Sequence, residues 1–398
     1  MCTCNPYIEE SVRLLKEMIA IPSPSFHEDE VCSHICSFLD RCGIVHYREK
    51  NNIIALNRHF DPAYKSLMLN AHLDTVPPAG GYSFDPYRPD YTKAAASIPG
   101  DRDFVCGLGS NDDGASAVSM TAAFRHFYDE PLPINLILVL TSEEERSGKN
   151  GMEKIWTEFP RIAGEAYRLT MRSGSTWGSG GDSNNPLSFS HPQWAVVGEP
   201  TGMAAATSER GLLVIDAVAE GVSGHAARNE GVNAIDIAVK DIESLHRHMF
   251  TKVSGQMGRV NLNVTQINAG TAHNIIPDRC SFVIDIRPTE MYSNREILDE
   301  LQAVCKSRLT ARNLDNRSSA TPGKSLLSEC IRSMGLRTFS SPTTSDWMRI
   351  GCEAVKMGPG ESSRSHRKDE FVYVDEIENA VGTYIDFIRN FCQIYRRQ

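Results

Sequence analysis

The pattern of apolar residues alternates between helical and extended spacing in the first half of the chain. Between Ile8 and Ile19, apolar residues recur every three or four positions, which predicts an amphipathic helix ending at the proline turn 22–24. A second helix is expected over 29–41. Apolar runs of strand length follow at 53–56, 67–71 and 136–140, with a helical stretch over 115–127 between the last two. This alternation predicts an α/β fold with a mostly parallel sheet covered on both faces.

The pattern changes near Ala204 and becomes that of a smaller, separate sheet. A strand, a helix, two strands and a helix are expected in that order, at 211–221, 233–248, 260–267, 281–286 and 295–309. The apolar strand 354–357 and a final helix over 374–395 would then return to the larger sheet. We therefore expect a second domain, residues 204–311, inserted into a first domain made of residues 1–203 and 312–398.

Composition narrows the classes of function. The 398-residue chain carries a formal charge of −9 and no cluster of Lys and Arg interleaved with aromatics, which argues against a nucleic-acid partner. No apolar run approaches the ~18 residues that a membrane span needs, and the N-terminus lacks the features of a secretory signal. Eleven scattered cysteines fit a reducing compartment better than a disulfide framework, so we expect a cytoplasmic protein.

Two cysteine pairs and one polar segment call for separate interpretation. Cys2–Cys4 and Cys32–Cys36 have spacings compatible with metal binding, but no second pair completes a tetrad, so we expect ordinary thiols. Residues 172–190 are rich in Ser and Gly and have almost no apolar periodicity, which predicts an exposed, mobile loop.

Five polar islands, far apart along the chain, lie at or near the ends of apolar runs. They are His72 with Asp74, Asp112, the triplet Glu143–Glu145, Glu199 and His366. The carboxyl ends of parallel strands meet at one edge of a sheet, so these imidazoles and carboxylates are expected to converge. Such a set of side chains suits two zinc-like cations.

Each island alone has a simpler interpretation. A His-x-Asp pair at a strand end is often a local polar cap, Asp112 also suits a helix N-cap, and three adjacent acids also form solvated turns. The segment 106–116 begins like a dinucleotide-binding fingerprint, but Asp112 replaces its third glycine. Its glycines are therefore expected to form a tight turn that presents this carboxylate. The joint occurrence of all five islands favours the metal site.

With these residues in place, the chain from about Ile8 onward resembles the co-catalytic zinc peptidase and deacylase family. That family includes acetylornithine deacetylase, succinyl-diaminopimelate desuccinylase, aminoacylase and carboxypeptidase G. The segments 111–116 and 358–371 (GPGESSRSHRKDEF) are most similar to its acetylornithine deacetylase-like branch. The resemblance implies a zinc-exopeptidase-like catalytic domain with an inserted α+β, ferredoxin-like lid and dimerisation domain, in a homodimer.

The resemblance also implies a role for each island. Two sets of ligands are implied, one for each divalent ion: His72, Asp112 and Glu199, and Asp112, Glu145 and His366. Zinc is the expected metal, with cobalt or manganese as alternatives. Glu144 matches the general base and Asp74 the residue that orients His72. The two ions would lower the pKa of a water molecule and polarise the amide carbonyl, while Glu144 moves the water's proton to the leaving amine.

Residues of the inserted domain match the family's substrate-binding segments. In GVSGHAAR, His225 is implied to stabilise the tetrahedral oxyanion in the active site of a partner subunit. In GTAHNIIPD and DIRP, Asn274 and Arg287 are implied to contact the carboxylate of the substrate. The segment TTSDW at 343–347 resembles a further substrate-side loop.

Three features depart from the family pattern. Asp113 and Gly114 directly follow the bridging aspartate, where many members have a lysine in an Asp-x-Lys-Gly motif. Some acetylornithine deacetylases have Asp in place of Glu199, which weakens that substrate assignment without weakening metal binding. The segment 172–190 lengthens the chain between Glu145 and Glu199.

The hypothesis that follows is a dinuclear metal amidohydrolase that removes an acetyl or succinyl group from a small amino acid such as N-acetylornithine, as in arginine synthesis. A dipeptidase or carboxypeptidase of the same family is the alternative. A binding protein that lost catalysis is disfavoured because all five ligands and Glu144 are present. A serine hydrolase is disfavoured because the sequence has no Gly-x-Ser-x-Gly elbow.

Overall fold

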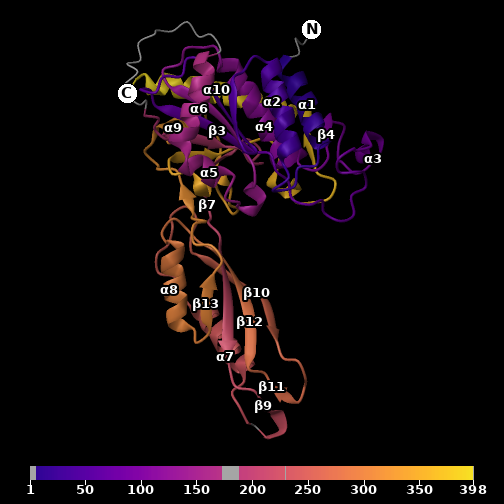
Figure 1. The fold of residues 1–398 in the computed structure, drawn as a ribbon, viewed down its shortest axis with the longest axis vertical. Helices are drawn as coiled ribbons and strands as arrows, with labels where there is room; N and C mark the ends of the chain where they lie inside the picture. The colour runs from indigo at the N-terminus through magenta and orange to yellow at the C-terminus, as the bar shows by residue number, and fades with distance from the viewer. Residues whose placement is uncertain (1–5, 173–187, 229, 398) are drawn as a thin grey trace. The chain divides into compact units, whose positions relative to one another are not determined.

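Buried strands and amphipathic helices build two separate units. The computed structural model describes residues 6–172, 188–228 and 230–397, so Cys2, Cys4 and most of the expected loop 172–190 lie outside the described residues. The first unit comprises Met1–Thr207, Thr321–Phe339 and Ser345–Gln398, and the second comprises Ser208–Ala320 and Ser340–Thr344. Figure 1 shows the elements of each unit.

The large sheet is parallel in its centre and antiparallel at its flanks. Its described strands, in spatial order, are β1 (His46–Glu49), β2 (Asn52–Leu56), β5 (Asn135–Thr141), β3 (Ser66–His72), β6 (Trp194–Val197), β16 (Glu353–Lys356), β7 (Ala205–Glu209) and β14 (Ser319–Ala320), with β15 (Thr338–Ser341) beside β7. Strands β5, β3, β6 and β16 run parallel to one another. Strands β2, β3, β5 and β6 are buried along their whole length, as strands covered on both faces must be. The predicted α/β class is confirmed.

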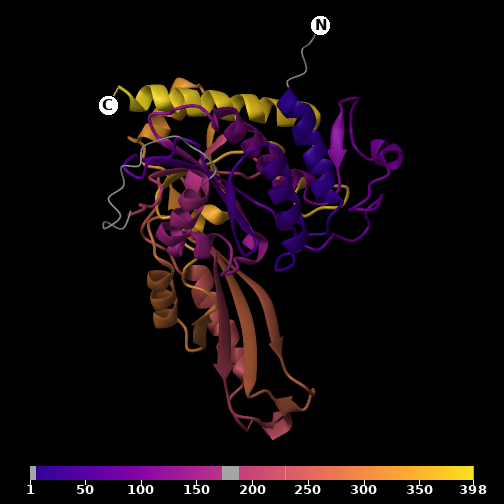
Figure 2. The same ribbon diagram turned by 45° about the horizontal axis from the view of Figure 1, so that its top comes forward.

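Helices cover both faces of this sheet. One apolar core lies under α1 (Pro6–Ile19), α2 (Asp29–Arg41), α4 (Ala115–Phe127), α9 (Leu326–Ser333) and α10 (Val374–Tyr395). The other lies under α5 (Met152–Thr157) and α6 (Phe159–Arg172). Figure 2 shows α10, in yellow, running along this unit. No helix in the described ranges, α10 included, has both the length and the apolarity needed to cross a bilayer.

A short extension of the first unit lies beside the sheet. It consists of α3 (Tyr91–Ala95), β4 (Phe104–Cys106) and β17 (Phe371–Tyr373), and β4 pairs antiparallel with β17. A small apolar cluster that includes Phe84 and Ile98 fills it. The β4–β17 pair brings the segment before Asp112 next to the segment after His366, although they are far apart in sequence.

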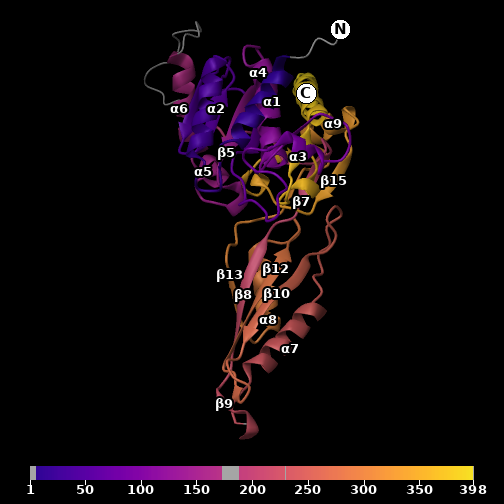
Figure 3. The same cartoon turned by 90° about the vertical axis from the view of Figure 1, so that its right-hand side faces the viewer.

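The second unit is a four-stranded antiparallel sheet with two helices. Its main elements, in chain order, are β8 (Leu213–Glu220), α7 (Ala234–Arg247), β10 (Asn261–Ala269), β12 (Arg279–Arg287), α8 (Asn294–Val304) and β13 (Arg308–Ala311). The strand order β10-β12-β8-β13 is that of a ferredoxin-like fold. Both helices contribute to a single core against the sheet, which Figure 3 shows from the side. The short strands β9 (Gly224–His225) and β11 (Ile275–Ile276) pair with each other.

The sequence predicted the wrong end for one helix. We expected a helix over 295–309, but α8 ends at Val304 and the next residues enter β13, which pairs with β8. The cause is tertiary: the buried carboxylate of Asp241, on α7, accepts hydrogen bonds from the backbone N–H groups of Lys306 (3.0 Å) and Ser307 (2.7 Å). These bonds divert the chain out of the helix, and Asp241 is too distant in sequence for a local pattern to reveal them.

Replacement of one leucine in the central strand β5 will test the packing of the first unit. Leu138 is fully buried, so Leu138→Ala is expected to lower the free energy of unfolding by about 2–5 kcal/mol. The matched control Leu169→Ala, at a site 37 % exposed, is expected to change it by about 0.5 kcal/mol or less. Urea unfolding followed by the fluorescence of Trp156, Trp194 and Trp347 reports on this unit. Equal effects of the two substitutions would contradict the described core.

Candidate metal centre

The ends of the parallel strands carry the polar islands to one edge of the large sheet. His72 is the last residue of β3, the acidic triplet follows β5, and Glu199 lies just beyond β6. Asp112 lies in the turn 110–114 before α4, and His366 lies in the loop between β16 and β17. Because the strands are parallel and neighbouring, these side chains share one site in the folded chain.

The carboxylate of Asp112 lies between two imidazoles. Its Oδ1 atom is 3.2 Å from Nε2 of His72, and its Oδ2 atom is 3.7 Å from Nε2 of His366. The carboxylate of Glu145 lies 3.0 Å from the same nitrogen of His366. The side chains of His72 and Asp112 are 2 % and 10 % exposed, whereas that of His366 is 55 % exposed, so one side of the site opens to solvent. Each oxygen of Asp112 thus faces a different histidine, as a carboxylate bridging two cations would.

The side chains fit two divalent cations by type and by spacing. Two groups have ligand atoms that all lie within 4.8 Å of one another: His72, Glu144 and Glu199, and His72, Asp112 and Glu145. Imidazole nitrogens and carboxylate oxygens are the ligands that zinc, cobalt and manganese accept. Distance alone therefore does not separate Glu144, the expected base, from the expected ligands.

The electrostatics of the site favour a bound positive charge. Burial, with repulsion from Glu199 and Glu145, raises the pKa of Glu144 well above its usual value. Burial and the charge of Asp112 raise the pKa of Glu199 in the same direction. The hydrogen bond to Glu145 raises the pKa of His366 to about 9. Protons on these groups thus offset part of the crowded negative charge, and divalent cations would do so more completely.

The turn that carries Glu144 and Glu145 is held by Asp74. One oxygen of Asp74 accepts a hydrogen bond from the backbone N–H of Glu144 (3.0 Å), and the other accepts one from the N–H of Glu145 (3.1 Å). The hydroxyl of Ser25 donates a third bond, of 2.7 Å, to the same carboxylate. The ring nitrogen Nδ1 of His72 lies 2.9 Å from the backbone oxygen of Asp74 and 3.4 Å from its carboxylate. Asp74 therefore fixes two of the islands at once.

Glu28, which the sequence did not single out, holds the start of this turn. One of its carboxylate oxygens accepts hydrogen bonds from the backbone N–H groups of Phe26 (2.8 Å) and Glu143 (3.1 Å). Glu143 has a φ of 60°, in the left-handed region that a glutamate rarely adopts, and its own carboxylate accepts from Asn150. The only local signal was an acid at the start of α2, which also suits a helix N-terminus.

Glu370 holds the turn that presents Asp112. Its carboxylate, 2 % exposed, accepts three backbone hydrogen bonds, from Gly109 (3.0 Å), Asn111 (2.8 Å) and Asp112 (2.9 Å). Burial raises its pKa to about 8. In sequence, Glu370 is one acid among several after His366, so its role becomes visible only in the fold.

Two further acids lie beneath the site. Asp113, which stands in the segment that departs from the family motif, is buried and accepts the backbone N–H of His72 at 3.3 Å. Asp346, within the segment TTSDW, is 5 % exposed, and its carboxylate accepts the hydroxyl of Thr141 at the end of β5. Asp346 is therefore a buried support of the end of β5, and the substrate-side role expected for TTSDW stays a prediction.

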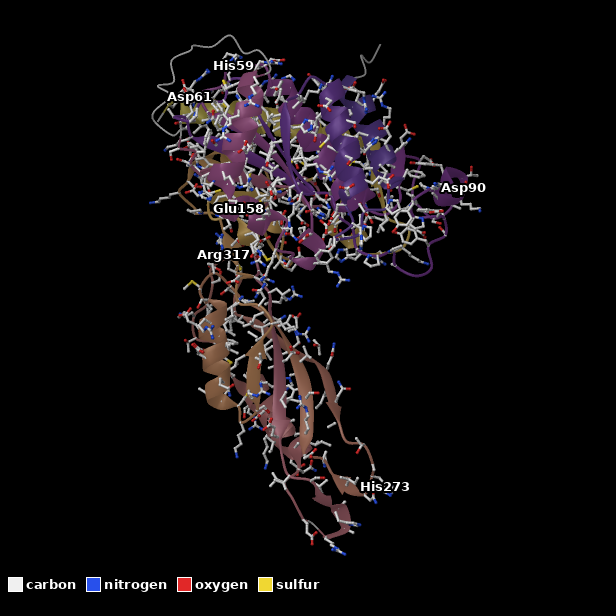
Figure 4. The ribbon with its side chains drawn as sticks, viewed as in Figure 1. His59, Asp61, Asp90, Glu158, His273 and Arg317 are labelled. Atoms are coloured by element: carbon white, nitrogen blue, oxygen red, sulfur yellow. The ribbon has the colours of Figure 1, made fainter. Side chains whose placement is uncertain are left out.

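The residues of the second unit that are expected to contact the substrate lie in two separate places. Strand β9 ends at His225 and pairs with β11, which directly follows Asn274, so these two residues lie at the same end of the unit; Figure 4 labels the adjacent His273. Arg287 ends the nine-residue strand β12, roughly 27 Å from its first residue at about 3.4 Å per residue. Its guanidinium donates two hydrogen bonds to Asp285, of 2.9 and 3.1 Å. One chain therefore does not bring Asn274 and Arg287 to the same carboxylate.

Comparisons with known proteins agree with this architecture. Residues 207–313 match the model of the M20 peptidase dimerisation domain. Acetylornithine deacetylase of Myxococcus xanthus is 23 % identical over 383 residues, covering 89 % of this chain and 87 % of its own length. A putative succinyl-diaminopimelate desuccinylase of Mycobacterium tuberculosis is 26 % identical over 401 residues, covering 96 % of this chain and 98 % of its own.

Solved structures show the same fold. An M20 family metallo-carboxypeptidase of Sulfolobus solfataricus superimposes with a TM-score of 0.69 at 15 % identity, over 96 % of this chain and 99 % of the other. A dinuclear metal-binding peptidase of Bacillus subtilis superimposes with a TM-score of 0.64 at 15 % identity, over 96 % and 97 %. The fold, the matched dimerisation domain and the full-length relatives agree with the cluster of imidazoles and carboxylates. The chain therefore carries an M20 peptidase dimerisation domain, and over most of its length it is similar to a deacetylase, a desuccinylase and an M20 metallo-carboxypeptidase.

Proposed function

We propose that this protein is a dinuclear metal amidohydrolase that removes an acetyl or succinyl group from a small amino acid such as N-acetylornithine. The observation that carries the proposal is the carboxylate of Asp112, with one oxygen facing His72 and the other facing His366. Two relatives that match most of the chain, at 23 % and 26 % identity, are named for removing an acetyl and a succinyl group. Their names support the substrate class, and a role in arginine synthesis follows if acetylornithine is the substrate.

Each ion would have its own ligands, with Asp112 shared. We assign the ligands as follows: His72, Asp112 and Glu199 for one ion, and Asp112, Glu145 and His366 for the other. Zinc fits this set of nitrogen and oxygen ligands, as cobalt and manganese also would. When bound, the ions would supply Lewis acidity that lowers the pKa of water and polarises the amide carbonyl.

Glu144 is the proposed general base. Its backbone is fixed by Asp74, and its carboxylate lies within 4.8 Å of the ligand atoms of His72 and Glu199. From there it would take a proton from the attacking water and deliver it to the leaving amine nitrogen. Asp74 would also keep His72 in the orientation that presents Nε2 to the metal, because Nδ1 already faces the backbone oxygen of Asp74.

The second unit would complete the site in a homodimer. We propose that His225 stabilises the oxyanion of the tetrahedral intermediate and that Asn274 binds the substrate's carboxylate, both reaching the partner's site. Arg287 is proposed to act at the other end of the sheet, where Asp285 already holds its guanidinium. Arg287 lies at the end of β12 opposite to the end near His225 and Asn274. This separation supports contributions from two chains, because one chain does not bring all three residues to one substrate.

A substrate panel tests the proposed reaction. N-acetylornithine, other N-acetyl and N-succinyl amino acids, and dipeptides would be assayed with added zinc, with and without a chelator. We expect turnover of an N-acyl amino acid at least about tenfold above any dipeptide in kcat/KM, loss of activity in chelator, and recovery with zinc. Preference for dipeptides would favour a dipeptidase or carboxypeptidase, the activity class of the solved carboxypeptidase neighbour. Activity that persists in chelator would reject the metal mechanism.

The substitution Glu144→Gln tests whether Glu144 is the general base or a metal ligand. If Glu144 moves the proton, kcat is expected to fall by about 10²- to 10⁴-fold while the protein still binds two ions, because glutamine keeps the shape but cannot take a proton. Metal content after dialysis would be measured by atomic emission. Glu165→Gln, a partly exposed residue of α6 that pairs with Arg168, serves as the control and should leave both values unchanged. Loss of one ion in Glu144→Gln would instead make Glu144 a ligand.

Mixed dimers test whether His225 acts in the partner's site. His225→Ala alone is expected to lower kcat by about 10²- to 10³-fold with both ions retained, whereas His246→Ala, exposed on α7, should have no effect. Co-expression of His225→Ala with Glu144→Gln is expected to recover about a quarter of wild-type activity. Half of the dimers are then hybrids, and each hybrid has one intact site. No recovery in purified hybrid dimers would contradict action between subunits.

A further inference from the structure

One buried amide joins the two segments that carry Asp112 and His366. Asn111, directly before Asp112, is fully buried. Its Nδ2 atom donates to the backbone oxygen of Glu361 (3.1 Å) and to the hydroxyl of Ser365 (3.3 Å), and its Oδ1 atom accepts the backbone N–H of Glu361 (3.0 Å). Ser365 immediately precedes His366. A single side chain thus bonds the turn of Asp112 to the residues that lead into His366.

The same two segments meet again just after His366. Glu370, four residues further on, accepts three backbone N–H groups from the turn 109–112. His366 itself has a φ of 56°, in the left-handed region that few residues other than glycine adopt. Such a backbone conformation persists only where neighbouring contacts hold it. The bonds of Asn111 and Glu370 flank His366 in the chain and supply such contacts.

The loop that carries His366 also has other anchors. The N–H of Gly202 donates to the carbonyl of Gly360 at 2.6 Å. The guanidinium of Arg364 donates two hydrogen bonds to Glu376 on α10, of 2.7 and 3.0 Å. Loss of the buried amide is therefore expected to shift the loop relative to the turn of the bridging carboxylate without unfolding it.

We propose that Asn111 is a positioning residue that sets the distance between Asp112 and His366, and thereby the affinity for the ion that these two residues would share. This inference rests on the metal ligands of the proposed function. Nε2 of His366 and Oδ2 of Asp112 are 3.7 Å apart, and one cation needs both atoms in its coordination sphere, so a small shift of the loop weakens its binding. The other ion, with His72 and Glu199, has no ligand in the loop. Asn111 itself would contact neither ion.

Zinc binding to the folded protein tests this role. Chelator-treated protein would be titrated with zinc by calorimetry, and the wild type is expected to bind two ions. Asn111→Ala should weaken one site by about 10- to 100-fold and change the other by about twofold or less, because loss of a partner that orients a metal ligand has an effect of that size. Equal weakening of both sites, or of neither, would overturn the proposal.

A matched control separates positioning from general destabilisation. Asn135, at the start of β5, lies at the opposite end of that strand from the acidic triplet and is 1 % exposed. Its amide makes the same pattern of bonds, to the N–H (2.9 Å) and the carbonyl (2.8 Å) of Asp61 and to the hydroxyl of Ser66 (3.3 Å). Asn135→Ala should therefore keep both zinc affinities, even if it lowers stability. Selective loss of one ion in this control would show that any such amide matters, which contradicts a specific role for Asn111.

A double substitution identifies the site on which Asn111 acts. His366→Ala is expected to weaken one of the two zinc sites strongly. Addition of Asn111→Ala should then change the remaining affinity by about twofold or less, because the amide acts through His366. Effects that simply add would mean that Asn111 acts elsewhere, and the proposal would be wrong.

Glu370→Gln tests the contact between the segments from the other side, and it decides the question if Asn111→Ala does not fold. Glutamine keeps the shape of the side chain but presents an N–H donor to the N–H groups of the turn. The site that includes His366 should again weaken more than the other, by about tenfold, and no change in either site would reject the role of these contacts. Zinc binding is measured without substrate. A wild type that binds fewer than two ions would overturn the proposed function together with this inference, whereas two ions bound equally by the wild type and Asn111→Ala would overturn the inference alone.

Discussion

The structure depends on holding several carboxylates of like charge at a single edge of one sheet. Glu144, Glu145 and Glu199 are buried at this edge, and burial together with repulsion from neighbouring carboxylates raises their pKa values. Asp112 differs: burial acts to raise its pKa, but the hydrogen bond to His72 and the charges of His72 and His366 together lower it. Such crowding opposes folding unless positive charge compensates it, so the edge is arranged for cations. The imidazoles of His72 and His366, one facing each oxygen of Asp112, mark the two positions that we propose for the cations.

A second group of acids secures the turns that carry the proposed ligands. Asp74 accepts two backbone N–H groups of those turns, Glu370 accepts three, and Glu28 accepts one, from Glu143. Backbone donors suit this task because they are rigid and carry no competing negative charge. The expected ligands are therefore held by hydrogen bonds from the protein itself, which is how a site keeps its geometry while its ligands repel one another.

In the second unit, by contrast, the sheet holds the proposed functional residues far apart. His225 and Asn274 lie at the paired strands β9 and β11, whereas Arg287 lies at the far end of β12. A strand is stiff and has a fixed rise per residue, so no local rearrangement joins these two places. This separation is a property of one chain, and it is the reason that the proposed site requires a contribution from a second copy.

The sequence by itself determined the α/β class and the order of the main helices and strands of both units. It also predicted that His72, the acidic triplet and Glu199 would lie at one edge of the large sheet, because burial patterns identify strands and the carboxyl ends of parallel strands meet at one edge. It did not reveal Glu28 or Glu370, nor the end of α8, because each depends on a carboxylate bound to backbone far away in sequence. Periodicity reports which face of an element is buried. Only the folded chain decides which distant backbone groups a buried acid will meet.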